Sequence, residues 1–178
     1  MASWLESYAP RRFDELAMDG SISSNFERVS IQANPPHLII AGPAGVGKTA
    51  AWRLVARQIL GPSWKSTTHV LQARDLAKSA GAMKKFEEFL RPEGTNSGDT
   101  LAGRSSLDSF DVNLTQAAVG DTPPAGKENR ELNQEGGQNV SRIIIIEDAD
   151  HLGPTRQPYL RRMMESTSST SRFIFTAR

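Results

Sequence analysis

The sequence predicts an α/β fold in which helices cover both faces of a parallel sheet. Short apolar runs alternate along the chain with segments whose apolar residues recur at helical spacing. The runs are apolar at consecutive positions, as expected of strands that are buried on both faces. A chain of 178 residues, 38% of them hydrophobic and 23% charged, suits one domain of this kind.

The first expected strand and helix are bounded by proline and glycine residues, which end regular secondary structure. The apolar run 37–41 lies between Pro35-Pro36 and Gly42-Pro43, which favours a buried strand. Residues 48–60 then carry apolar side chains at helical spacing, and Gly61-Pro62 supplies the stop.

Later segments repeat the alternation of strand and helix. Four consecutive isoleucines at 143–146 are β-branched throughout and predict a central strand. The remaining expected elements are a short strand near 69–73, a helix through 84–90, a helix at 160–165 and a final strand at 173–176.

Residues 92–141 differ in composition from the rest of the chain. They are rich in Gly, Ser, Thr, Asn, Asp and Pro and carry a net charge of −5, whereas the remainder carries +6. Apolar residues are too sparse there to bury a core, so we expect a disordered acidic insertion between residues 1–91 and 142–178, the two parts of the folded core. The segment is interpreted equally well as a solvated insertion of no mechanistic consequence or as a tether or docking segment.

Several function classes are poor matches to this composition. The chain has no cysteine, and its three histidines show no zinc-ligand spacing. No apolar run approaches the ~20 residues of a membrane span, and the first ten residues do not resemble a signal peptide. We therefore expect an intracellular protein with no membrane partner.

The first strand-to-helix junction carries a phosphate-binding motif. Residues 42–49 satisfy the GxxxxGK[ST] pattern between an expected strand and an expected helix, which is the context of a Walker A loop and predicts a three-layer P-loop fold. Its glycines let backbone N–H groups surround phosphates, and the helix N-terminus adds partial positive charge. Lys48 is expected to neutralise the β- and γ-phosphates of ATP, and Thr49 to ligate Mg²⁺. The predicted nucleotide-binding residues here are Gly42, Pro43, Ala44, Gly45, Val46, Gly47, Lys48 and Thr49.

A second motif follows the isoleucine strand. P-loop proteins hold magnesium with a carboxylate at the end of a neighbouring strand, and the sequence Glu147-Asp148-Ala149-Asp150 supplies carboxylates at that point. These residues form the Walker B candidate.

Taken together, the stretches resemble the AAA+ core of the small subunits of replication factor C, the archaeal and eukaryotic sliding-clamp loader. The start of the chain, Trp4-Leu5-Glu6-Ser7-Tyr8-Ala9-Pro10, is similar to the family's W-x-E-K-Y-R-P opening. The segments that resemble the family elsewhere are Pro35-Pro36-His37-Leu38 leading into the Walker A loop, Leu71-Gln72-Ala73-Arg74-Asp75 (L-N-A-S-D), Gln157 to Glu165 (Q-x-A-L-R-R-T-M-E) and Ser171 to Thr176 (T-R-F-I-L).

This resemblance implies an ATPase ring that opens a sliding clamp, places it on primer-template DNA and releases it after ATP hydrolysis. The partners implied are the other clamp-loader subunits, the clamp and the DNA, in the cytoplasm or nucleoid of an archaeon or in the nucleus of a eukaryote.

By resemblance, the adenine pocket is lined by Tyr8, Pro10, Leu16 and Ala17. Gln157 and Arg161 are expected to couple DNA to the nucleotide site, and Lys84 and Lys85 to contact DNA phosphates, although such residues also suit a solvated helix face.

The chain departs from the family pattern at several positions. Ser7, Ala9 and Met18 replace the family's Lys, Arg and usual Gly, and Arg178 aligns with the asparagine called sensor 1. The family's D-E-A-D is written here as Glu147-Asp148-Ala149-Asp150, which exchanges the two key carboxylates. Glu147 is then expected to serve the magnesium shell, and Asp148, the candidate catalytic carboxylate beside Lys48, to orient the attacking water. The helical lid and the collar domain of the family are expected to be absent from this chain.

Three functions remain open at this point. The first is an ATP-hydrolysing clamp-loader subunit, and the second is a catalytically weak subunit that serves the ring as a structural part. The third, a P-loop kinase, predicts a substrate lid with catalytic arginines inside the insertion, and the composition of residues 92–141 argues against it.

Overall fold

A computed structural model describes residues 8–90 and 140–178 of the chain. Contacts divide these residues into two compact units: residues 8–35 and 45–65 belong to the first, and residues 36–44, 66–90 and 140–178 to the second. The expected insertion, residues 92–141, lies almost entirely outside the described residues. Among the helices of the described ranges, none has both the length and the apolar character needed to cross a bilayer.

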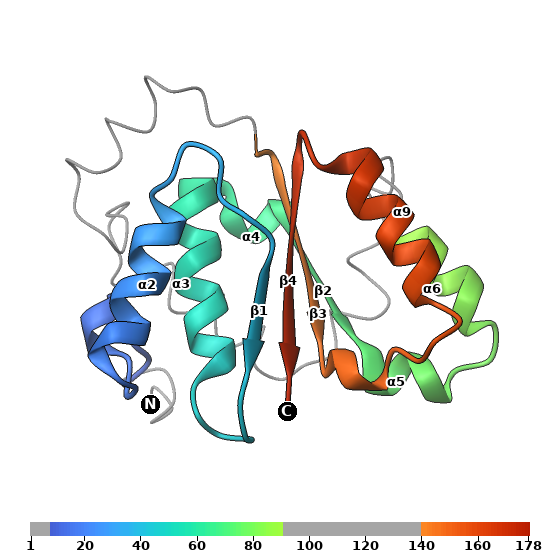
Figure 1. The fold of residues 1–178 in the computed structure, drawn as a ribbon, viewed down its shortest axis with the longest axis horizontal. Helices are drawn as coiled ribbons and strands as arrows, with labels where there is room; N and C mark the ends of the chain where they lie inside the picture. The colour runs from blue at the N-terminus through green and yellow to red at the C-terminus, as the bar shows by residue number, and fades with distance from the viewer. Residues whose placement is uncertain (1–7, 91–139) are drawn as a thin grey trace. The chain divides into compact units, whose positions relative to one another are not determined.

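The second unit is built on a four-stranded parallel sheet (Figure 1). Its strands are β1 (Leu38–Ala41), β2 (Thr68–Gln72), β3 (Arg142–Glu147) and β4 (Ser171–Ala177). The strand order is β1-β4-β3-β2, and every neighbouring pair is parallel. All four strands therefore present their carboxyl ends at one edge of the sheet. The predicted parallel sheet with a central isoleucine strand is confirmed.

Helices of the same unit cover one face of this sheet. They are α5 (Ala73–Lys78), α6 (Ala82–Leu90) and α9 (Gln157–Thr167), and the short 3-10 helix η3 (Ala149–His151) follows β3. Figure 1 shows α6 and α9 side by side, and the rings of Phe86 and Tyr159 join them with centroids 6.1 Å apart.

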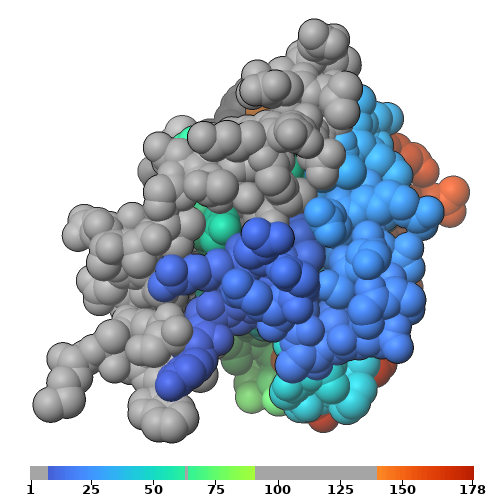
Figure 2. Space-filling model, turned by 90° about the vertical axis from the view of Figure 1, so that its left-hand side faces the viewer, coloured from blue at the N-terminus to red at the C-terminus, as the bar shows by residue number. Residues whose placement is uncertain are grey.

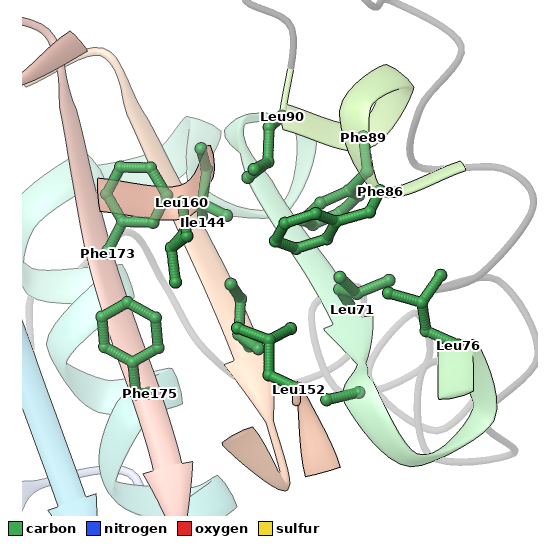
Figure 3. Close-up of a cluster of buried hydrophobic side chains, with 12 residues drawn as sticks. Leu71, Leu76, Phe86, Phe89, Leu90, Ile144, Leu152, Leu160, Phe173 and Phe175 are labelled. Carbon is green, nitrogen blue, oxygen red and sulfur yellow. The ribbon is translucent and has the colours of Figure 1, made fainter. Parts of the chain in front are cut away.

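A hydrophobic cluster fills the space between these helices and the sheet (Figure 3). Phe86 and Phe89 of α6 point toward the strands, where they meet residues such as Leu71, Ile144 and Phe173. On β3 and β4 the alternate residues Ile143, Ile145 and Ile174 are also buried. Burial on both faces explains why these strands are apolar at consecutive positions.

The first unit is helical. It contains η1 (Phe13–Glu15), α2 (Gly20–Ser30), α3 (Lys48–Leu60) and η2 (Gly61–Ser63), and the short α4 (Trp64–Thr67) runs from it into the second unit. The Ser23 hydroxyl of α2 donates to the carbonyl of Phe13, which ties the 3-10 helix to α2. Figure 2 shows the described N-terminal residues, in blue, as one continuous surface.

The boundaries of most elements agree with the sequence predictions. Helix α3 spans 48–60 as expected, with Ala51, Leu54, Val55 and Ile59 buried. The strand expected near 69–73 is β2, which ends at Gln72 because α5 begins at Ala73. Helix α2 was not predicted, although the Asp19 carboxylate caps its N-terminus by accepting from Ser21 N–H at 2.8 Å.

Candidate nucleotide-binding site

The Walker A loop leaves the sheet at the carboxyl end of β1. The Gly42 N–H donates to the Ala177 carbonyl at the end of β4, at 3.1 Å, so the start of the loop is fixed to the neighbouring strand. Gly45 and Gly47 have φ values of 84° and 91°, in the left-handed region that favours glycine. The positive φ values explain why the motif has glycine at both positions.

Helix α3 begins directly after the loop. Gly47 is its N-cap, Lys48 and Thr49 are its first two residues, and Ala51 N–H donates to the Gly47 carbonyl at 2.9 Å. The side chains of Lys48 and Thr49 are half-buried. A glycine loop that ends in a helix N-terminus with a cation and a hydroxyl has the chemistry needed to bind phosphate groups.

Glu147 ends β3 and lies beside β2. The Nε2 of Gln72, its register partner on β2, donates a hydrogen bond to Glu147 Oε2. The half-buried carboxylate is therefore oriented by a neutral amide on the neighbouring strand. Hydrogen bonds of this kind orient carboxylates that ligate metals.

Asp148 occupies an unusual backbone conformation. Its φ of 52° and ψ of 47° make it the one residue other than glycine with a positive φ in the described ranges. Aspartate tolerates this region better than most residues. Its N–H donates to Thr176 Oγ1 at 3.2 Å, and its Oδ2 lies 3.4 Å from Arg74 Nε. Both contacts join Asp148 to neighbours at the carboxyl edge of the sheet.

Asp150 and Arg178 lie close together at the same edge. The Arg178 N–H donates to Asp150 Oδ1 at 3.3 Å. Backbone hydrogen bonds from Asp150 itself and from Arg178, together with the nearby positive charges of His151 and Arg178, lower the pKa of Asp150. Arg178 thus follows β4 at the carboxyl edge of the sheet, with its backbone held by a carboxylate, and its correspondence to sensor 1 stays a prediction.

The donor chemistry of these residues fits magnesium. Within the described ranges no group of three His, Cys, Asp or Glu side chains is assembled that would hold a metal ion by itself. Magnesium instead favours one or two protein oxygens together with phosphate oxygens and waters, and a threonine hydroxyl and a strand-end carboxylate are donors of that kind.

Comparison with known proteins identifies the family. The family model described as "ATPase family associated with various cellular activities (AAA)" matches residues 38–178. The chain belongs to the AAA family. The match begins at β1 and includes both the Walker A loop and the residues that follow β3.

Individual relatives cover nearly the whole chain. It is 27% identical to the replication factor C small subunit of Natronomonas pharaonis over 173 residues, 97% of this chain and 40% of the relative. It is also 28% identical over 174 residues, 98% of this chain, to replication factor C small subunit 2 of Pyrobaculum islandicum and to the replication factor C small subunit of Thermofilum pendens. These matches cover 42% of the Pyrobaculum protein and 41% of the Thermofilum protein. The resemblance to replication factor C small subunits is confirmed, and the chain spans about two-fifths of their length.

The residues expected around adenine in this AAA protein lie in the first unit. Tyr8 is 75% exposed and Ala17 is exposed, whereas Pro10 is half-buried and Leu16 is buried. Their role in adenine binding stays a prediction.

The residues expected to couple DNA lie on α6 and α9. Lys84 and Arg161 are more than four-fifths exposed, and each pairs with a glutamate one turn later, Glu88 at 3.8 Å and Glu165 at 3.1 Å. Lys85 and Gln157 are also exposed. Exposed pairs of this kind are weak, so these side chains remain accessible to other partners.

Three side chains at the carboxyl edge had no role assigned from the sequence: Gln72, Arg74 and Thr176 contact the Walker B residues. The segment 71–75 resembles the family's L-N-A-S-D strand end. Its contacts depend on the parallel register of β2 with β3, and spacing along the chain does not reveal that register.

Proposed function

We propose that this chain is an ATP-binding and ATP-hydrolysing subunit of a DNA sliding-clamp loader. The observation that carries the proposal is its similarity, over 97–98% of its length, to archaeal proteins named replication factor C small subunit. Membership of the AAA family, with a Walker A loop after β1 and carboxylates after β3, supports the ATPase part. The relatives' names favour this function over a purely structural subunit.

In this proposal, the loop residues and Lys48 bind the phosphates of ATP, and Tyr8, Pro10, Leu16 and Ala17 contact adenine. Thr49 and Glu147 would hold Mg²⁺, which supplies charge neutralisation at the phosphates when bound. Asp148 orients the water that attacks the γ-phosphate, and its carboxylate accepts the proton of that water. The parts 1–91 and 142–178 would together form the ATPase core, with 92–141 as an acidic insertion.

The proposed partners are other clamp-loader subunits, a sliding clamp and primer-template DNA. Lys84, Lys85, Gln157 and Arg161 are the candidate residues for coupling DNA to the nucleotide site, because they are exposed and polar. The insertion is a poor ligand for DNA, since its net charge of −5 repels phosphate. The protein would therefore act wherever the cell replicates its DNA.

We further propose that hydrolysis is slow. Asp148 is one methylene shorter than a glutamate at the same position, and misplacing a catalytic group by ~1 Å costs up to ~100-fold in rate. Nucleotide binding is spared, because the loop and Lys48 are unaltered relative to the motif.

The experiment that tests the proposal measures ATP turnover by the full-length protein, assembled with its partner subunits, with and without clamp and primed DNA. Slow basal turnover that rises when both are added supports the proposal. ATP binding with no turnover under any condition would favour a structural subunit. Failure to bind ATP at all would contradict both functions.

A further inference from the structure

One side chain from outside the Walker A motif lies against the phosphate-binding loop. Met18 precedes α2, and its Cε atom lies 3.8 Å from the point that a Cβ atom would occupy at Gly47, an ordinary van der Waals distance. Among the described residues, leaving aside the two chain neighbours of Gly47, no other atom comes within 4 Å of that point. The open side of this glycine therefore faces the tip of the methionine.

The backbone that carries Met18 is held on both sides. Met18 and Gly47 belong to the same compact unit, the helical first unit. The Met18 N–H donates to the carbonyl of Leu16 at 2.8 Å, and Leu16 is buried. The next residue, Asp19, caps α2, and α2 contacts α3. The half-buried side chain of Met18 is thus fixed at its base where it reaches the loop.

Gly47 is a point of the loop at which such a contact matters. It takes a φ of 91°, forms the N-cap of α3 and immediately precedes Lys48. An unrestrained glycine visits many backbone conformations, so a loop that must close on phosphates at a glycine loses conformational entropy when it binds. A side chain that packs against Gly47 removes part of this freedom before the nucleotide arrives.

We propose that Met18 is a positioning residue that holds Gly47 in its phosphate-binding conformation and thereby raises the affinity of the loop for the phosphates of ATP. The inference rests on the proposed function and concerns the affinity of the same site. The contact belongs to this chain's own sequence, because the glycine usual at position 18 in the family has no side chain to make it. Methionine suits the role, since its unbranched and flexible side chain adapts to an irregular surface.

The test compares Met18→Ala, Met18→Leu and the natural sequence in the full-length protein. Met163→Ala is the matched control, because it removes the same half-buried side chain from α9 in the second unit. Dissociation constants are measured by calorimetry for ATP and for inorganic triphosphate, which has no nucleoside, and thermal midpoints verify folding.

We expect Met18→Ala to weaken the binding of ATP and of inorganic triphosphate by the same factor, about fivefold, because the loop that binds both is less well held. Met18→Leu retains an apolar side chain of similar size and should recover most of the affinity. Met163→Ala should bind both ligands as the natural protein does, even if its thermal midpoint falls.

A second measurement examines the loop without any ligand. The order parameter of the Gly47 N–H, obtained from nitrogen-15 relaxation, should be lower in Met18→Ala than in the natural protein. The N–H of Gly61, at the far end of α3, should be unchanged and serves as the internal control. A purely structural role of Met18 would not confine the change to the loop.

Three results would overturn the inference while the proposed function stands. The first is weaker ATP binding with unchanged binding of inorganic triphosphate, which would place the effect of Met18 at the nucleoside. The second is unchanged or tighter binding of both ligands by Met18→Ala, and the third is a Gly47 N–H as ordered as in the natural protein. A natural chain that fails to bind ATP would contradict the proposed function itself, and this inference with it.

Discussion

The backbone N–H of Asp148 donates to the Thr176 hydroxyl on the adjacent strand β4 at 3.2 Å. Thr176 is only 3% exposed, and the strand that carries it ends next to Arg178. The turn that carries the candidate catalytic carboxylate is thus fastened to the strand leading to the sensor position. We therefore predict that position 176 influences catalysis, although Thr176 itself would not reach a reacting atom.

Replacing Thr176 by valine tests this link. Valine has nearly the same shape but no acceptor for the Asp148 N–H, so we expect stability to fall by about 1 kcal/mol. Turnover should fall by about tenfold as the carboxylate loses its fixed position, while ATP affinity stays the same. Thr155→Val, in an exposed loop, is the control. Equal turnover in Thr176→Val and the natural protein would show that the hydrogen bond does not position Asp148.

Lys48 is expected to dominate phosphate binding. Lys48→Ala removes the positive charge from the first residue of α3, and we expect ATP binding to be abolished in a titration with a fluorescent ATP analogue. Lys78→Ala removes a cation outside the loop and should bind normally. An unchanged affinity in Lys48→Ala would refute the assignment of the Walker A loop.

The sequence predicted the elements with strong local signals. Helix α3 has its expected limits because Gly47 and Gly61 take positive φ values at its two ends. Glycine is the residue that most readily adopts positive φ, so its positions in the sequence indicate where the helix begins and ends. The β3 isoleucines predict a central strand because any other place would expose them. Helix α2 escaped prediction because its sequence is rich in serine, although the Asp19 cap was a usable signal.

The contacts at the candidate site were beyond sequence reasoning for a different reason. Glu147 meets Gln72, and Asp148 meets Arg74, only because β2 and β3 pair in one particular parallel register across a gap of some 75 residues in the chain. The positive φ of Asp148 likewise arises from the turn after β3. Motif spacing identified the carboxylates, and tertiary structure selected their partners.

Truncating a side chain of the hydrophobic core should lower the free energy of unfolding much more than truncating an exposed one. Phe86 is fully buried between α6, the sheet and Tyr159, so Phe86→Ala should lower the free energy of unfolding by about 3–5 kcal/mol in urea denaturation. Ile39→Ala is the matched control, because Ile39 is 75% exposed and should change stability by less than ~0.5 kcal/mol. Similar losses in the two variants would contradict the assignment of the core.

Stability should fall in mild acid. His37 accepts the Phe173 N–H through Nδ1 at 3.0 Å, and burial, followed by the nearby charge of Arg172, lowers the pKa of His37. The unfolded chain then binds a proton that the folded chain resists, so this contribution is complete above the ordinary histidine pKa of about 6.5 and is lost as pH falls below it. Burial, with Arg142, lowers the pKa of His69 in the same direction.

The pH effect is measured as the urea midpoint from about pH 7.5 to about pH 5. The natural protein should lose stability over this range, and His37→Gln, which keeps a polar side chain but does not titrate, should lose less. An equal loss in both proteins would mean that His37 protonation is not coupled to unfolding.

The exchanged carboxylates are the central feature of the account. The variant that combines Glu147→Asp with Asp148→Glu restores the family's order and lengthens the candidate catalytic side chain by one methylene. Glutamate tolerates the positive φ at 148 less well than aspartate, so the thermal midpoint is recorded to confirm folding.

The most direct test is the ATP turnover of this double variant in the assembled clamp loader, compared with that of the natural chain. We predict that turnover rises by about tenfold or more while ATP affinity is unchanged, since the longer carboxylate reaches the attacking water. A double variant no faster than the natural chain, together with a natural rate already typical of a clamp loader, would contradict the account.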